Sequence, residues 1–174
     1  MHDRCFTAKD EMPEFRNECF EECTFTGIDF TGTPFTNALV EGTEFQDCTF
    51  TNCDFTGVEW YGGSGFIHCT WTDGTPGLVD MADERAHIQE MAAQVLGHPE
   101  AFNMLSWESW AGNCRTTRCM GGWLLHLDGQ TVNDSTGPAD TATRATRLAP
   151  HAAVHFWASD ENALRWLETQ VRHG

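Results

Sequence analysis

Large apolar side chains recur every five residues through the first part of the chain. From residue 11 to residue 60, each unit of five residues closes with an aromatic residue or a valine: Phe15, Phe20, Phe25, Phe30, Phe35, Val40, Phe45, Phe50, Phe55 and Trp60. Neither the helical period of about 3.6 residues nor the strand period of about 2 residues produces this spacing. The pattern therefore predicts a repeat structure in which each unit adds one large side chain to a common core.

A second, smaller side chain lies two residues before each of these positions. The residues concerned are Cys23, Ile28, Thr33, Ala38, Thr43, Cys48, Cys53 and Val58. The other three positions of each unit hold mostly Thr, Glu, Asp, Asn, Gln or Gly. We interpret the two apolar positions as inward-facing and the other three as the solvent face.

The register of the repeat shifts once and weakens at its start. After Trp60 the run YGGSG is one residue too long, and the pattern resumes at Phe66 and Trp71. Glycine accepts positive φ values, so this run predicts a bulge at residues 62–65. At the other end Glu18 occupies an inward position, which predicts a first full coil near Cys19 and a cap over residues 1–17.

These units resemble the pentapeptide-repeat family, whose units carry a central Phe or Leu with a small residue two places earlier. The resemblance implies a right-handed quadrilateral β-helix with four units per coil. Residues 20 apart should then stack, with Phe15 on Phe35 on Phe55 and Phe30 on Phe50. The predicted solenoid core comprises Phe20, Phe25, Phe30, Phe35, Phe45, Phe50, Phe55, Trp60, Phe66 and Trp71.

About three coils fit in this length, and at roughly 4.8 Å per coil they make a solenoid on the order of 15 Å tall. Stacked repeats need their ends covered, because a terminal coil exposes apolar side chains and unpaired backbone groups. The second half of the chain is the natural cover for one end.

Composition changes at the turn-rich linker Thr72–Asp80, which divides the chain into a predicted β-helix domain, residues 1–75, and a mainly α-helical domain, residues 76–174. Asp80 is a predicted N-cap for a helix over residues 81–96, whose apolar stripe includes Ile88 and Val95. Further helices are predicted over residues 120–127, over residues 138–148 and from Ser159 to the C-terminal region. Strand signals are sparse in this half.

The charge is −16 and is unevenly distributed, because residues 1–80 hold 15 acidic and 3 basic side chains. A charge of this sign repels nucleic acid, so direct nucleic-acid binding is not expected. No stretch approaches the roughly 18 consecutive apolar residues of a membrane helix, and the start lacks a signal-peptide pattern. Most of the eight cysteines fall at repeat positions, where they are small core side chains, so a cytoplasmic protein in a reducing compartment is expected.

Cys114, Cys119 and His126 form the first candidate site of the second half. If a helix begins near Thr116, Cys119, Trp123 and His126 share one face, and the cysteine and histidine could ligate zinc. The spacing lacks the tight C-x2-C element of zinc knuckles, so structural packing is favoured over a zinc site or a reactive thiol, and no cofactor is expected. A triad of either cysteine with His126 or His155 and Asp128 is a weaker alternative.

Two arginines and two tryptophans form a second candidate group. Arg115 and Arg118 lie at the predicted helix start and could bind an anion there, or could pair with the acidic solenoid. Trp107 and Trp110 would pack in the core or, if exposed, mark a protein interface.

The run CRTTRCMGGWLLHL also resembles an element of uncharacterised bacterial and bacteriophage proteins, over residues of about 100 to 167. Gly121 stands where that element more often has Ala. The resemblance implies a shared fold and no activity.

No phosphate-binding glycine loop, H-E-x-x-H or G-x-S-x-G motif occurs in the sequence. The leading hypothesis is therefore a non-enzymatic interaction or scaffold protein with a protein partner, which could belong to a virion or act in infection. The second is DNA mimicry, because some pentapeptide-repeat proteins resemble duplex DNA in width and charge and bind DNA gyrase. The third is a metal- or thiol-dependent enzyme or switch that uses Cys114, Cys119 and His126.

Overall fold

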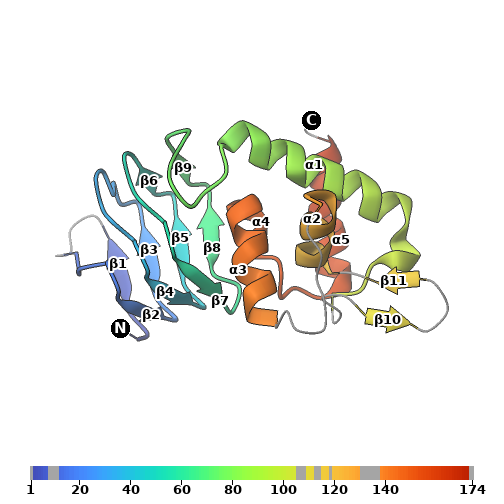
Figure 1. The fold of residues 1–174 in the computed structure, drawn as a ribbon, viewed down its shortest axis with the longest axis horizontal. Helices are drawn as coiled ribbons and strands as arrows, with labels where there is room; N and C mark the ends of the chain where they lie inside the picture. The colour runs from blue at the N-terminus through green and yellow to red at the C-terminus, as the bar shows by residue number, and fades with distance from the viewer. Residues whose placement is uncertain are drawn as a thin grey trace.

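The computed structural model describes residues 2–7, 12–104, 109–111, 115–117, 119–129 and 138–172, with the backbone alone for 109–111, 115–117 and 138–141. A β-solenoid of about three turns, residues 5–71, is followed by a helical region (Figure 1). The predicted fold class is confirmed. None of the described helices is long and apolar enough to cross a bilayer.

The solenoid strands stack in parallel ladders, one on each side of the coil. The first ladder contains β1 (Cys5–Thr7), β3 (Thr24–Thr26), β5 (Glu44–Gln46) and β8 (Gly65–Ile67). The second contains β2 (Cys19–Glu21), β4 (Leu39–Glu41) and β7 (Glu59–Tyr61), and the third contains β6 (Thr49–Phe50) and β9 (Thr70–Trp71). On the fourth side, Pro34 forms a bridge with Asp54.

The pairing register confirms the 20-residue coil and its single insertion. Phe25 pairs with Phe45, 20 residues later, but Phe45 pairs with Phe66, 21 residues later. The extra residue lies in the predicted bulge, where Gly62 and Gly63 have φ values of 62° and 79°. Glycine therefore takes up the extra residue without displacing the ring that follows it.

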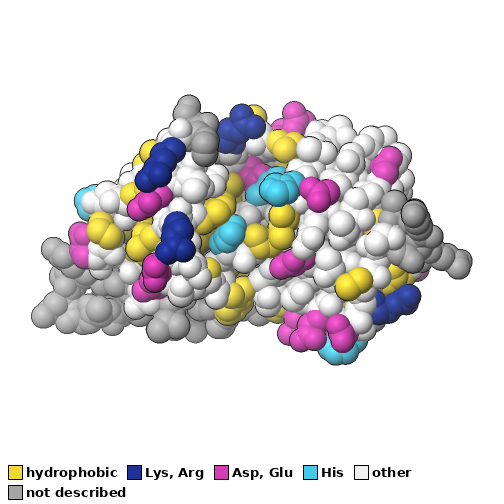
Figure 2. Space-filling view, turned by 180° about the vertical axis from the view of Figure 1, so that it is seen from behind, with side chains coloured by type: hydrophobic (Ala, Val, Ile, Leu, Met, Phe, Trp, Pro, Cys, Tyr) yellow, Lys and Arg dark blue, Asp and Glu magenta, His cyan; other side chains and the backbone are white. Residues whose placement is uncertain are grey.

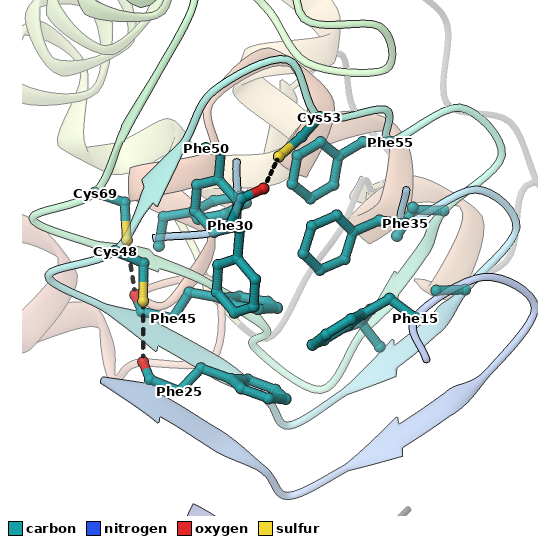
Figure 3. Close-up of a cluster of buried hydrophobic side chains, with 14 of the residues drawn as sticks. Phe15, Phe25, Phe30, Phe35, Phe45, Cys48, Phe50, Cys53, Phe55 and Cys69 are labelled. Atoms are coloured by element: carbon teal, nitrogen blue, oxygen red, sulfur yellow. Dashed lines mark hydrogen bonds between the residues drawn. The ribbon is translucent and has the colours of Figure 1, made fainter. Parts of the chain in front are cut away.

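Aromatic rings fill the inside of the solenoid in stacks (Figure 3). Ring centroids are 4.7 Å apart for Phe15 and Phe35, 4.5 Å for Phe35 and Phe55, and 5.1 Å for Phe30 and Phe50, as the 20-residue spacing predicts. All ten residues of the predicted core are buried. Several rings on adjacent sides of the coil, such as Phe30 with Phe35 and Phe45 with Phe50, meet edge to face, a favourable aromatic geometry.

The prediction that residues 1–17 only cap the solenoid is wrong. Strand β1 pairs with β3, and the Phe6 ring stacks on the Phe25 ring at 4.8 Å. The spacing from Phe6 to Phe25 is 19 residues, so Phe6 falls outside the five-residue frame and was missed. Glu18, predicted to point inward, is exposed.

A left-handed backbone residue marks the corners of the coil, two positions after each inward ring or valine from Phe15 to Phe66. These residues are Asn17, Glu22, Gly27, Gly32, Asn37, Gly42, Asp47, Asn52, Gly57, Gly62 and His68. Gly, Asn and Asp tolerate this conformation best, which explains why they recur at this position of the repeat. The polar positions of the repeat therefore do more than face solvent, because some of them hold the residues that the turns require.

The helical region contains α1 (Met81–Gly97), η1 (Pro99–Ala101), α2 (Met120–Leu127), α3 (Pro138–Leu148), α4 (Pro150–Ala153) and α5 (Asp160–Arg172). The four predicted helices are therefore confirmed. Asp80 is the N-cap residue of α1, but its carboxylate accepts a hydrogen bond from the Gly74 amide at 2.6 Å instead of from the helix. An antiparallel pair, β10 (Ser109–Ala111) with β11 (Arg115–Thr117), was not predicted, because such short strands show no clear alternation.

Helices α3 and α4 cover the C-terminal end of the solenoid, against β7 and β8 (Figure 1). The Thr143 hydroxyl accepts a hydrogen bond from the Trp60 amide at 2.9 Å and donates one to the Trp60 carbonyl at 3.1 Å. The Arg147 guanidinium donates to the Val58 carbonyl at 3.0 Å. Side chains of α3 thus replace the backbone partners that a further coil would supply to this end of the solenoid.

Candidate functional site

A cavity of about 450 Å³ lies where the solenoid meets the helices. Its walls come from β8, α1, α5 and the segment that contains α4. Figure 2 shows this hollow in the middle of the molecule, where hydrophobic side chains and histidines gather. Cavities of this size hold small organic ligands in many proteins, so its polar groups require individual description.

Glu84 lies on the buried face of α1, one turn before Ile88. Its residue exposure is 3%, although it is acidic. One carboxylate oxygen accepts a hydrogen bond from the His151 amide at 2.7 Å, and the other lies 2.7 Å from His151 Nδ1. The helix dictates this burial, because residue 84 continues the stripe of residues 88, 91, 92 and 95.

His151 connects Glu84 to the last coil of the solenoid. Its Nε2 lies 3.0 Å from the Cys69 carbonyl, and its ring stacks on Trp71 with centroids 5.1 Å apart. The ring thus contacts a carboxylate on one side and a backbone carbonyl on the other. Through these contacts Glu84 and His151 join α1, α4 and the solenoid.

His155 and Trp166 form another part of the cavity wall. Their ring centroids are 4.5 Å apart, and burial lowers the pKa of His155 below its ordinary value of 6.5. The imidazole is therefore uncharged at neutral pH and offers one donor and one acceptor nitrogen. Among the described residues, neither ring nitrogen has a hydrogen-bond partner.

The remaining lining combines apolar side chains with Arg85 and the amides of Gln89 and Gln170. No Ser, Thr, Cys or Lys side chain occurs among the described residues that line the cavity.

Cys119, for which the sequence favours structural packing over a role as metal ligand or reactive thiol, is the N-cap residue of α2. Its sulfur accepts a hydrogen bond from the Gly122 amide at 3.4 Å, and its residue exposure is 1%. Burial raises the pKa of the thiol to about 11, which disfavours the thiolate that nucleophilic attack or metal binding requires.

Of the other candidate residues for that site, His126 and Asp128 lie at the opposite end of α2 from Cys119. His126 is exposed, and its ring meets Trp123 edge to face at 5.8 Å. Asp128 is the C-cap residue of α2, and Cys114 lies outside the described residues. In the part of the chain that the structure describes, no three His, Cys, Asp or Glu side chains are grouped to hold a metal ion.

The predicted helix start near Thr116 is wrong, because residues 115–117 form β11 and α2 begins at Met120. Arg115 therefore does not lie at a helix N-terminus. Its side chain and that of Trp110 are not described, and Arg118 and Trp107 lie outside the described residues. The anion and interface hypotheses for these four residues stay predictions.

Three cysteines of the solenoid donate hydrogen bonds to carbonyl groups of the preceding coil (Figure 3). Cys48 donates to the Phe25 carbonyl at 3.4 Å, Cys53 to the Phe30 carbonyl at 2.8 Å and Cys69 to the Phe45 carbonyl at 3.1 Å. Burial raises the pKa of Cys53 to about 11. These thiols are small side chains that satisfy backbone acceptors inside the solenoid.

Acidic side chains gather on the ladder formed by β2, β4 and β7, where two of them are directly opposed. Glu21 and Glu41 are register partners in neighbouring coils, and Glu59 pairs with Leu39. Glu41 and Glu59 are exposed, and Glu21 is half-buried. Like charges in directly opposed positions destabilise a sheet, so this side of the solenoid concentrates negative charge at some cost in stability.

Comparison with known families agrees with the repeat. A family model described as pentapeptide repeats matches residues 19–57 in eight copies, so this part of the chain consists of pentapeptide repeats. No curated protein matches the chain.

The solved structures to which the chain is similar include QnrB1, a plasmid-mediated fluoroquinolone resistance protein. The identity is 18%, the TM-score is 0.24, and the match covers 39% of this chain and 48% of that one. The chain thus matches about half of that protein's length, and this likeness carries no argument about function.

Proposed function

Because residues 19–57 are pentapeptide repeats that carry stacked acidic side chains, we propose that this protein is a non-enzymatic protein-interaction module. The acidic group formed by the opposed pair Glu21 and Glu41 together with Glu59, on the same ladder, carries the proposal. A partner with a basic surface would relieve the repulsion between these carboxylates and gain favourable electrostatic contacts. The helical region would cover the solenoid end and add a second surface.

Affinity purification from a bacterial lysate tests the proposal. The wild-type protein and the triple variant Glu21→Gln, Glu41→Gln, Glu59→Gln would be compared by quantitative mass spectrometry at low and at physiological salt. We expect at least one protein to bind the wild type, with salt-sensitive recovery that falls about ten-fold or more with the variant. A control variant, Glu90→Gln, removes an exposed carboxylate from α1 outside the ladder and should leave recovery unchanged.

Two results would contradict the proposal. One is that no protein is recovered specifically, and the other is that recovery is the same for the triple variant and the wild type. Thermal unfolding of each variant is the control for folding. A role in a virion or in infection follows only from the resemblance of the run CRTTRCMGGWLLHL to an element of bacterial and bacteriophage proteins. It would require a partner from a bacteriophage or from an infected cell.

DNA mimicry is a second candidate function, favoured by the net charge of −12 over residues 1–80, where 15 acidic residues face 3 basic ones. The short solenoid argues against it, because about three turns present little more than a fragment of a duplex. Supercoiling of plasmid DNA by purified gyrase, with and without excess protein, is the direct test. Unchanged supercoiling at a large excess would exclude gyrase as the target.

A further inference from the structure

In the cavity between the solenoid and the helices, the buried carboxylate already has hydrogen-bond partners. Glu84 is buried, and each of its two carboxylate oxygens contacts His151, one through the backbone amide and one through Nδ1. His68, at the rim, lies 3.4 Å from the Asp47 carboxylate. Arg85 is the remaining charged side chain among the described lining residues, and it is exposed. The buried part of the cavity therefore offers no unpaired charge to a ligand.

The uncommitted polar groups of the cavity are uncharged and both donate and accept. His155 presents one donor and one acceptor nitrogen, and the side chain of Gln89 presents an amide. The Trp166 indole, which packs against His155 with the two rings tilted by 31°, and Ile88 supply planar and apolar surface beside them. Flat apolar surface next to paired donors and acceptors is complementary to a flat molecule with a hydrogen-bonding edge.

From this geometry we infer that the junction cavity is a binding site for a small, uncharged, planar aromatic compound that carries an amide-like hydrogen-bonding edge. The inference goes beyond the interaction function and does not depend on it. A carboxylate would enter against the negative charge of the chain, and a cation would find the Glu84 carboxylate already occupied and Arg85 nearby.

The apolar walls also place the ligand between the two parts of the molecule. Ile67 comes from the solenoid strand β8, Ile88 from α1 and Trp166 from α5. A compound that fills the cavity would contact all three elements. Because it would bind the folded protein and not the unfolded chain, it should stabilise the folded state.

A set of three probes with the same ring system and different charge tests the inference: 2-naphthamide, 2-naphthoate and 2-naphthamidine. At pH 7.5 they are neutral, anionic and cationic. Binding to the full-length protein would be followed by the NMR signal of the Trp166 indole N–H, assigned with Trp166→Phe. We expect saturable shifts with 2-naphthamide, and dissociation constants about ten-fold or more higher for both charged probes.

Two variants test whether the probe binds in the cavity. Gln89→Trp adds a large side chain at a half-buried position on α1 and should weaken 2-naphthamide binding about ten-fold or more by filling the space. His155→Phe keeps an aromatic ring against Trp166 and removes both nitrogens, so about five-fold weaker binding is expected. Arg165→Gln, on α5 outside the cavity, is the matched control and should bind as the wild type does.

Three results would each overturn the inference. Absence of a saturable Trp166 shift with 2-naphthamide up to its solubility limit overturns the inference. So does binding of either charged probe as tightly as the amide, or unchanged binding by Gln89→Trp. Amide NMR spectra and thermal unfolding of each variant show whether it has folded, and an unfolded Gln89→Trp would be replaced by Gln89→Phe.

Discussion

Glu84, His151 and His155 show how strongly a residue's chemistry depends on its immediate neighbours. The first two contact each other and join the helices to the solenoid, while burial lowers the pKa of His155, whose ring packs against Trp166. Identical side chains elsewhere in the chain, such as His68 and His98, are exposed and simply lie near carboxylates.

The lowered pKa of His155 predicts how stability changes with pH. In the unfolded chain this histidine takes up a proton near pH 6.5, whereas the folded protein takes it up only at lower pH. Its contribution to stability is therefore complete above pH 6.5 and is lost as the pH falls below that value. Urea unfolding at pH 7.5 and 5.5 should show a larger loss for the wild type than for His155→Gln.

Every other titratable group is present in both proteins, so the comparison isolates the contribution of His155. An equal loss of stability in the wild type and in His155→Gln would show that the burial of His155 has no effect on folding.

Gly77 carries a second prediction at the residue scale. Its φ is +84°, and a Cβ at this position would collide with the backbone of Phe55. Gly74, in the same linker, has φ +78° and open space around it. We expect Gly74→Ala to lower the free energy of unfolding by about 1 kcal/mol and Gly77→Ala by about 3 kcal/mol or more, measured by urea unfolding. Equal effects would mean that only backbone conformation matters there.

At the scale of the element, each coil is held by inward rings and by small residues that reach the neighbouring coil. The ring positions could be predicted from their five-residue period, and the structure places them as expected. The hydrogen bonds of the cysteines to carbonyls of the preceding coil could not, because a bond between residues 23 apart depends on how the coils stack.

Native-state alkylation tests the buried state of these thiols. Cys5 is exposed, whereas Cys53 and Cys119 are buried with pKa values raised to about 11. With iodoacetamide at pH 8, we expect Cys5 to react within minutes and the other two to stay unmodified until urea is added, as followed by peptide mass spectrometry. Reaction of Cys53 at the rate of Cys5 in the native protein would contradict this packing.

At the scale of the whole molecule, the helical region completes the solenoid. Thr143 serves both backbone groups of Trp60, and Arg147 serves the carbonyl of Val58. The need for a cover followed from the repeat alone, but the helices that supply it, and the cavity left beside them, depend on the packing of segments more than 80 residues apart.

Thr143 provides the test of this cover. Thr143→Val keeps the shape of the side chain but leaves the buried amide and carbonyl of Trp60 without partners, so we expect a loss of about 2–3 kcal/mol in the free energy of unfolding. Thr143→Ser keeps the hydroxyl and should cost less than about 1 kcal/mol. Urea unfolding of both variants measures these losses. Equal losses of unfolding free energy would show that packing, and not hydrogen bonding, holds α3 against the end of the solenoid.

The sequence by itself determined the solenoid, its 20-residue coil, its single bulge and the main helices, because local periods and turn residues encode them directly. The tertiary structure alone decided that Phe6 joins the core, that Cys119 caps a helix, and that Glu84 meets His151 at a cavity. Each of these depends on contacts between distant segments, and no spacing along the chain records such contacts.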